Sequence, residues 1–337
     1  MIIHRTSDRI TVAAPAKVNL FLEVLGKRQD GFHEVQTVLC PISLFDELSF
    51  EVTESGRIDF QLRLPHTASE TPPGSQQSQQ SSQQSSQQNA PPPLPHDPAW
   101  DIPADDRNLV VRAVRQVQKM LGTSRGCRIE LTKTIPAAAG LGGGSSDTAA
   151  AVVASLLAWD KWDRQLARTV CAAIGSDIPF FLGDRQGIGL AVATGRGENC
   201  QAVAAQPTLE MIVTHPPVGC STQEVYLNYA NTAEKRDFRK IVAACETGYP
   251  EMVGAELFNA LQFAGSGSTD WIQRQLQLFS ACGAPHAIMS GSGSSCFALI
   301  DEPSSVTRVR QAAAECGLSR VFLVEAWYGD SIEHQDV

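Results

Sequence analysis

The sequence has 337 residues, of which 43% are hydrophobic, enough for about two domains with apolar cores. Its formal net charge of −9 and pI near 5.3 argue against nucleic acid or an acidic membrane surface as a bulk partner, whereas a nucleotide needs only a few local donors. The nine cysteines are scattered and form no C-x-x-C pair, which predicts a cytoplasmic protein with reduced thiols. The sequence shows no apolar leader and no run of about 18 apolar residues, so no signal peptide and no membrane span are expected.

The first part of the chain is expected to form strands. Short apolar runs and alternating patterns predict them at residues 10–12, 18–24, 37–39 and 57–64.

Residues 71–98 differ from the rest because Gln, Ser and Pro dominate and apolar residues nearly vanish. Such a segment cannot bury enough apolar surface to offset its ordering entropy, so it predicts a disordered surface insertion. A Pro-rich segment that binds a partner is the alternative. We expect a purified deletion variant to keep its turnover.

A helix is expected after the insertion, because residues 109–121 carry one apolar stripe at helical spacing. Asp105 and Asp106 are the expected caps, and Gly122 ends the helix. Further helices are expected at 148–157 and 164–174, and strands at 128–133, 188–193, 211–213, 288–289 and 296–300. Because helices and strands mix without strict βαβ alternation, the sequence predicts the α+β class.

The most informative segment lies between the strand at 128–133 and the helix at 148–157. It reads Pro136-Ala137-Ala138-Ala139-Gly140-Leu141-Gly142-Gly143-Gly144-Ser145-Ser146. Glycines let the backbone approach a ligand, and a helix start offers unpaired N–H groups, so this loop predicts an anion site for nucleotide phosphates. It is neither a P-loop nor a G-x-G-x-x-G motif, because Ser145 stands where those motifs need Lys or Gly. A turn that packs the helix tightly on the strand is the alternative.

Three more segments accompany this loop: Pro15-Ala16-Lys17-Val18-Asn19-Leu20, Gly175-Ser176-Asp177-Ile178-Pro179-Phe180-Phe181 and the Gly/Ser loop at 290–295. Together the four resemble the GHMP kinase superfamily, whose members carry a P-x-x-x-G-L-G-S-S-type phosphate loop and a glycine-rich motif near the C-terminus. The segments PAKVNLFLEVLGKRQDGFHEV and GSDIPFFL are similar to members that phosphorylate a cytidine diphosphate-linked methylerythritol. The resemblance covers nearly all of the chain except the insertion.

The resemblance implies a two-domain α+β kinase, with an ATP-binding domain at 1–204 that is like domain 2 of ribosomal protein S5 and a ferredoxin-like domain at 205–330. It implies ATP and Mg²⁺ as cofactors, phosphorylation of the 2-hydroxyl of the cytidine-linked acceptor in non-mevalonate isoprenoid biosynthesis, and a monomer or weak homodimer. A kinase for another small alcohol, such as homoserine or mevalonate, is the first alternative. A nucleotide-binding module without catalysis is the second.

The resemblance assigns catalysis to Asp177 and Lys17. Asp177 would take the proton of the acceptor hydroxyl, and Lys17 would orient Asp177 and stabilise charge on the acceptor oxygen and the γ-phosphoryl group. From the residues alone, Asp177 could equally be a turn or cap residue before Pro179, and Lys17 a solvated surface lysine.

The resemblance places ATP along the loop and at Asn108, beside the adenine. Backbone N–H groups of the glycines would hold phosphates, Ser145 and Ser146 would donate to them, and Ser146 is a candidate Mg²⁺ ligand. Asn108 alone could equally cap a helix, as could Asp147. No metal-ligating carboxylate is assigned.

The acceptor residues are also implied by the resemblance. Asn19 would hold the reacting end, and the remaining positions would bind cytosine or the diphosphate: Phe32, His33, Thr222, Tyr226, Gly291, Ser292 and Gly293. Phe32 stands where better-known relatives have Tyr, so stacking is kept and a hydroxyl is lost. The alternatives are an ordinary surface histidine at His33, a strand amide paired with backbone at Asn19 and a β-turn between buried strands at 290–295.

Overall fold

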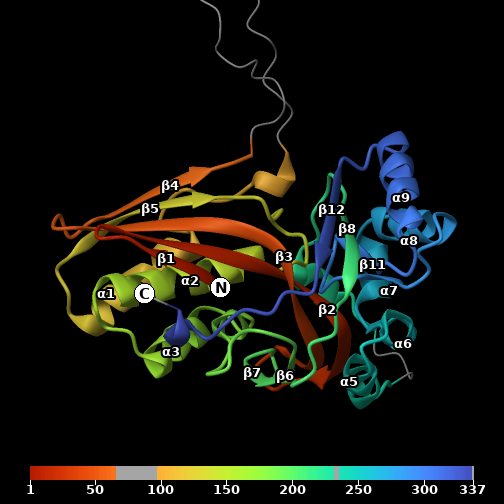
Figure 1. Cartoon of the computed structure of the whole chain (residues 1–337), viewed down its shortest axis with the longest axis horizontal. Coiled ribbons are helices and arrows are strands. Elements are labelled where there is room, and N and C mark those ends of the chain that lie inside the picture. Colours follow the sequence, from red (N-terminus) through yellow and green to blue (C-terminus); the bar gives the residue numbers. More distant parts are fainter. Residues whose placement is uncertain (66–96, 231–234, 336–337) are drawn as a thin grey trace, which may run out of the picture.

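The computed structural model describes residues 1–65, 97–230 and 235–335. The described strands form two sheets, which stand side by side in Figure 1. The first contains β1 (Ile2–Arg5), β2 (Arg9–Lys27), β3 (His33–Thr53), β5 (Gly126–Thr132) and β4 (Ile58–Arg63) in that order. In addition, β9 (Phe258–Asn259) pairs with β2, β6 (Ala191–Gly195) pairs with β3, and β7 (Asn199–Ala202) pairs with β6. The second has the order β10 (Ala287–Met289), β11 (Cys296–Leu299), β8 (Glu210–His215) and β12 (Arg320–Glu325).

The helices divide between the two sheets (Figure 1). Those beside the first sheet are α1 (Leu109–Leu121), α2 (Gly143–Ala158) and α3 (Arg164–Ile174). Those in the second half are α4 (Thr222–Leu227), α5 (Phe238–Thr247), α6 (Pro250–Ala255), α7 (Gln262–Ser268), α8 (Trp271–Ala281) and α9 (Ser304–Glu315). Short 3₁₀ turns are η1 (Pro98–Trp100), η2 (Ile178–Leu182) and η3 (Ile332–His334). This is the predicted α+β architecture, and no described helix has the length and apolarity needed to cross a membrane.

The strands β2 and β3 are much longer than predicted. The runs at 10–12 and 18–24 belong to one strand, whose pairing with β3 shifts register between Pro15 and Ala16 and again between Asn19 and Phe21. Proline lacks an N–H and is tolerated in a sheet at such bulges, so Pro15 lies at a bend within one strand where the sequence pattern predicts two separate strands. The bend places Lys17 beside the phosphate loop. There the backbone N–H of Lys17 donates to Leu141 O at 2.9 Å.

The helix α2 is buried on all sides. Its apolar residues from Ala149 to Leu156 have almost no exposed surface, as expected of a central helix that is hydrophobic all round. It begins at Gly143, five residues before the predicted start at Thr148. The last glycines and both serines of the loop therefore form its first turn.

The helix α1 has the predicted bounds and ends at Gly122 in the left-handed region. The predicted caps are wrong, because Asn108 caps it: its Oδ1 accepts the Val110 N–H at 2.9 Å. Asp105 instead accepts from Arg107. The predicted strand at 188–193 is displaced to β6, since Ile188 makes only an isolated bridge with Gly329.

The predicted insertion at 71–98 lies outside the described residues except for its last two. Asp97 and Pro98 belong to the folded chain, because η1 begins at Pro98 and the Asp97 carboxylate caps it by accepting the Ala99 N–H at 3.1 Å. The last two residues of the predicted insertion therefore overlap the start of η1, and the prediction for 71–96 lies outside the described residues. At the other predicted boundary, the strands other than β9 change sheet between Ala202 and Glu210. The limits 1–204 and 205–330 remain a proposal.

Candidate functional site

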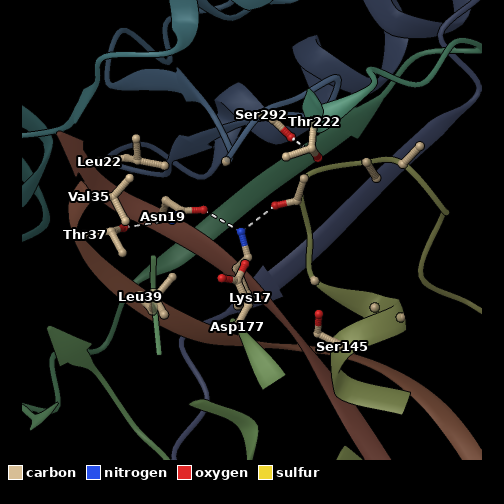
Figure 2. A pocket seen from close by; sticks show the side chains of 18 of the residues that line it. Lys17, Asn19, Leu22, Val35, Thr37, Leu39, Ser145, Asp177, Thr222 and Ser292 are labelled. Atoms are coloured by element: carbon tan, nitrogen blue, oxygen red, sulfur yellow. Dashed lines mark hydrogen bonds between the residues drawn. The ribbon is translucent and has the colours of Figure 1, made fainter. Parts of the chain in front are cut away.

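A cavity of about 290 Å³ lies at the junction of the two sheets. It is lined by the bent part of β2 and β3, the loop before α2, the start of η2 and the Gly/Ser loop after β10. Figure 2 shows Lys17, Asn19 and Asp177 projecting into this space, with Ser145 at one side and Thr222 with Ser292 at another. Lys17 and Asp177 therefore meet most of the loop and the acceptor positions Asn19, Thr222, Tyr226, Gly291 and Ser292 in one cavity. The predicted residues Phe32, His33, Ser146 and Gly293 are not part of its lining.

Lys17 is buried, with only 4% of its surface exposed, so it is not a solvated lysine. Its ammonium group donates to Asn19 Oδ1 at 2.5 Å and to the Gly140 carbonyl oxygen at 2.8 Å (Figure 2). Burial lowers the pKa of Lys17 to about 8, and the nearby Asp177 carboxylate opposes that shift. A buried ammonium group with a lowered pKa is typical of a functional site.

Asp177 precedes η2 but does not cap it, because its side chain makes no capping hydrogen bond. It faces the cavity, and Ser176 Oγ lies 3.5 Å from its Oδ1. Gly197 approaches from the turn between β6 and β7, so closely that a Cβ there would lie 2.7 Å from Asp177 Oδ1. Among the described side chains Lys17 and Asp177 form no ion pair within 4.0 Å, so the Asp177 carboxylate acts on Lys17 through space.

The loop before α2 needs its glycines. Gly140 and Gly142 have φ of +72° and +73°, in the left-handed region. A Cβ at Gly140 would lie 2.1 Å from Ser290 O, and one at Gly142 would lie 3.0 Å from Lys17 Cγ. Gly143, Gly144 and Ser145 then form the first turn of α2 and line the cavity. The first N–H groups of a helix have no intrahelical partner, so this end of α2 can bind an anion.

A second cavity, of about 230 Å³, adjoins the same loop. Its lining includes Asp101, Ile102, Pro103, Asn108 and Leu109 on one side and Ala137, Ala138 and Gly144 of the loop on the other. Asn108 shapes this cavity while its amide is already engaged: Oδ1 caps α1, and Nδ2 donates to Pro103 O at 2.7 Å. Two cavities that share the phosphate loop suit a nucleotide whose base and phosphates lie on either side of it.

The acceptor side contains an aromatic pair. The His33 ring stacks on Tyr226 with ring centroids 5.1 Å apart and an interplanar angle of 28°, and Tyr229 meets His33 edge-on. Phe32 is 54% exposed, and the Arg196 guanidinium lies 4.7 Å from its ring centroid. Sequence reasoning did not find Tyr229 or Arg196.

The polar acceptor positions are held by hydrogen bonds. Thr222 Oγ1 and Ser292 Oγ lie 2.8 Å apart, and both residues line the first cavity, as does Gly291. Asn19 is not paired with backbone: its Nδ2 donates to Thr37 Oγ1 at 2.8 Å while its Oδ1 accepts from Lys17.

Comparisons with known proteins decide the family. Family models described as the GHMP kinases N terminal domain and the GHMP kinases C terminal match residues 108–185 and 241–317. A protein of Rhodopirellula baltica named 4-diphosphocytidyl-2-C-methyl-D-erythritol kinase is 35% identical over 303 residues, which cover 86% of this chain and 87% of that protein. This chain belongs to the GHMP kinase family.

Other GHMP kinases agree. A Bacillus pumilus protein of the same name is 35% identical over 307 residues, covering 89% of this chain and 91% of that protein. A crystal structure of 4-(cytidine 5'-diphospho)-2C-methyl-D-erythritol kinase matches with a TM-score of 0.67 and 27% identity, over 94% of this chain and 98% of that one. Homoserine kinase from Cytophaga hutchinsonii matches with a TM-score of 0.66 but only 16% identity, over 98% of each chain, and shows the fold alone.

The GHMP kinase loop of this chain rests on a buried ionic cluster that sequence reasoning missed. Lys133 Nζ contacts Asp46 Oδ2 and lies 2.6 Å from Asp147 Oδ2. Asp46 Oδ1 also accepts the N–H groups of Thr134 and Ile135, at 2.6 and 2.9 Å. The cluster therefore ties the residues that enter the loop to the first turn of α2.

The electrostatics of this cluster follow from its burial. Burial alone would lower the pKa of Lys133, but the carboxylates of Asp147 and Asp46 outweigh it and raise that pKa. Burial raises the pKa of Asp147 well above its usual range, and the neighbouring Asp46 carboxylate raises it further while the Lys133 ammonium group opposes both. A signal was present in the sequence: Lys133 follows the buried Ile129 and Leu131 on the same face of the strand pattern.

Proposed function

We propose that this GHMP kinase transfers the γ-phosphoryl group of ATP to the 2-hydroxyl of 4-diphosphocytidyl-2-C-methyl-D-erythritol, in the non-mevalonate route to isoprenoid precursors. One observation carries the proposal: a single cavity holds a buried ammonium group, a carboxylate, the N-terminus of a helix and Tyr226 of the aromatic pair. The names of the 31–35% identical relatives supply the acceptor.

The first cavity supplies the groups that phosphoryl transfer requires. Asp177 takes the proton of the 2-hydroxyl as its oxygen forms a bond to the γ-phosphorus, and the bond from that phosphorus to the β,γ-bridging oxygen breaks to release ADP. Lys17, placed by Asn19 and Gly140, stabilises the charge that develops on the transferred group. The first N–H groups of α2 bind the phosphates that remain on ADP.

Mg²⁺ fits the donor set beside the loop. In the described parts of the chain no three His, Cys, Asp or Glu side chains are grouped to hold a metal, so the ion would be shared with the nucleotide phosphates. Ser146 Oγ and Asp147 Oδ1 are buried without a hydrogen-bond partner, and oxygen atoms are the ligands that Mg²⁺ prefers. These two residues would hold it, and the ion would neutralise charge on the β- and γ-phosphates.

The acceptor would extend from Asp177 toward the aromatic pair. Thr222 and Ser292 offer hydroxyl groups to the diphosphate, while His33, Tyr226 and Phe32 offer a polar ring edge and two stacking faces to cytosine.

An acceptor panel tests the proposal. The purified protein is incubated with ATP and Mg²⁺ and with the cytidine-linked methylerythritol, homoserine or mevalonate, and ADP release is followed by a coupled assay. The proposal expects release with the cytidine-linked acceptor and a phosphomonoester signal in the product by ³¹P NMR. Release with homoserine or mevalonate alone would assign another acceptor, and no release with any would contradict the kinase function.

A further inference from the structure

One short segment joins the two halves of the molecule beside the second cavity. Residues 97–103, here called the anchor segment, begin with Asp97, whose carboxylate pairs with the Arg320 guanidinium at the start of β12. Both side chains are largely buried, 27% exposed for Asp97 and 16% for Arg320. The Arg320 guanidinium also lies 5.7 Å from the Trp100 ring centroid. The start of the anchor segment is therefore fixed to the second sheet.

The rest of the anchor segment contacts the phosphate loop. Ala99 O accepts the Ala137 N–H at 2.9 Å, and Ala137 lines both cavities. Asp101, Ile102 and Pro103 then form a wall of the second cavity. Arg320 of β12, in the second sheet, thus holds the wall of the second cavity through its ion pair with Asp97.

We propose that Asp97 and Arg320 are positioning residues for the nucleotide. Their ion pair holds the anchor segment in place, so the wall at 101–103 and the start of the phosphate loop are ordered before ATP arrives. Without the pair, ordering that segment becomes a cost of binding. The inference rests on the proposed function and places the nucleoside of ATP in the second cavity, on the other side of the phosphate loop from the first.

Arg320→Gln and Asp97→Asn test this inference. The dissociation constant of a non-hydrolysable ATP analogue, measured by titration calorimetry with Mg²⁺, is expected to rise roughly fivefold in each variant. KM for ATP should rise in parallel, while kcat and KM for the acceptor stay unchanged. The reversed pair, Asp97→Arg with Arg320→Asp, is expected to recover part of the loss. Arg274→Gln is the matched control, because it breaks the exposed Arg274–Asp270 pair on α8.

The outcomes separate this inference from the proposed function. If both single variants bind the analogue within about twofold of the unmodified protein, Asp97 and Arg320 do not position the nucleotide. A similar loss of acceptor affinity would also overturn the inference, because it would indicate a general loss of structure. If the unmodified protein itself fails to bind the analogue, the proposed function fails instead.

Discussion

The ammonium group of Lys17 donates a hydrogen bond to the carbonyl oxygen of Gly140 at 2.8 Å. This bond joins β2 to the phosphate loop and places the buried cation where the transferred phosphoryl group would lie. Gly140 also meets the Gly/Ser loop, since Ser290 Oγ donates to the same carbonyl oxygen at 2.9 Å. One backbone oxygen thus connects the groups assigned to catalysis, phosphate binding and acceptor binding.

Lys17→Met is expected to reduce kcat by about 10²- to 10³-fold, because it removes the cation that stabilises the developing charge. Binding of a non-hydrolysable ATP analogue should change far less, since the α2 N-terminus remains. Steady-state kinetics and calorimetry measure the two quantities. Lys119→Met, at an exposed lysine of α1, is the control and should keep full activity. A Lys17→Met variant with near-normal kcat would remove Lys17 from the catalytic machinery.

The activity should fall at alkaline pH because Lys17 has a pKa of about 8. Burial lowers this pKa below the 10.5 of an exposed lysine, so the ammonium group loses its proton as pH rises through about 8 and its charge is lost. The same shift makes folding less favourable below pH 8 and relieves that cost between pH 8 and 10.5, because the unfolded chain then binds the extra proton. A profile of kcat/KM that stays flat to pH 10 would contradict this assignment.

Lys133→Met is expected to destabilise the protein by about 3–5 kcal/mol, because it leaves Asp46 and Asp147 buried without their shared cation. Urea unfolding followed by circular dichroism measures the change. Arg274→Gln, which removes a cation from an exposed pair, should change the free energy of unfolding by less than about 0.5 kcal/mol. A comparably small effect at Lys133 would show that the cluster does not support the loop.

His33→Ala should raise KM for the cytidine-linked acceptor by about tenfold or more, since the ring stacked on Tyr226 is lost together with its polar edge. KM for ATP should not change, because His33 lines neither of the two cavities beside the phosphate loop. Steady-state kinetics with each substrate varied in turn measures both constants. An unchanged acceptor KM would favour an acceptor without a cytosine base.

The local sequence patterns predicted the parts of the fold and site that depend on neighbouring residues. Helix α1, the loop before α2 and the two segments around Lys17 and Asp177 each follow from a short stretch of sequence, and the structure brings them together. The Asp97–Arg320 pair spans a sequence separation of 223, and no local pattern reveals such a partner. Asp46 shows an intermediate case, because its alternation with the buried Leu44 and Leu48 indicates burial but not its contact with Lys133.

The central claim is that Asp177 accepts the proton of the cytidine-linked acceptor in this cavity. Its most direct test compares the rate of ADP release with that acceptor between the unmodified protein and Asp177→Asn, a change that keeps the size of the side chain and removes its basicity. The account predicts release by the unmodified protein and a fall of about 10²-fold or more in the variant, with binding of the ATP analogue retained. Equal rates in the two proteins, or no release by the unmodified protein, would contradict it.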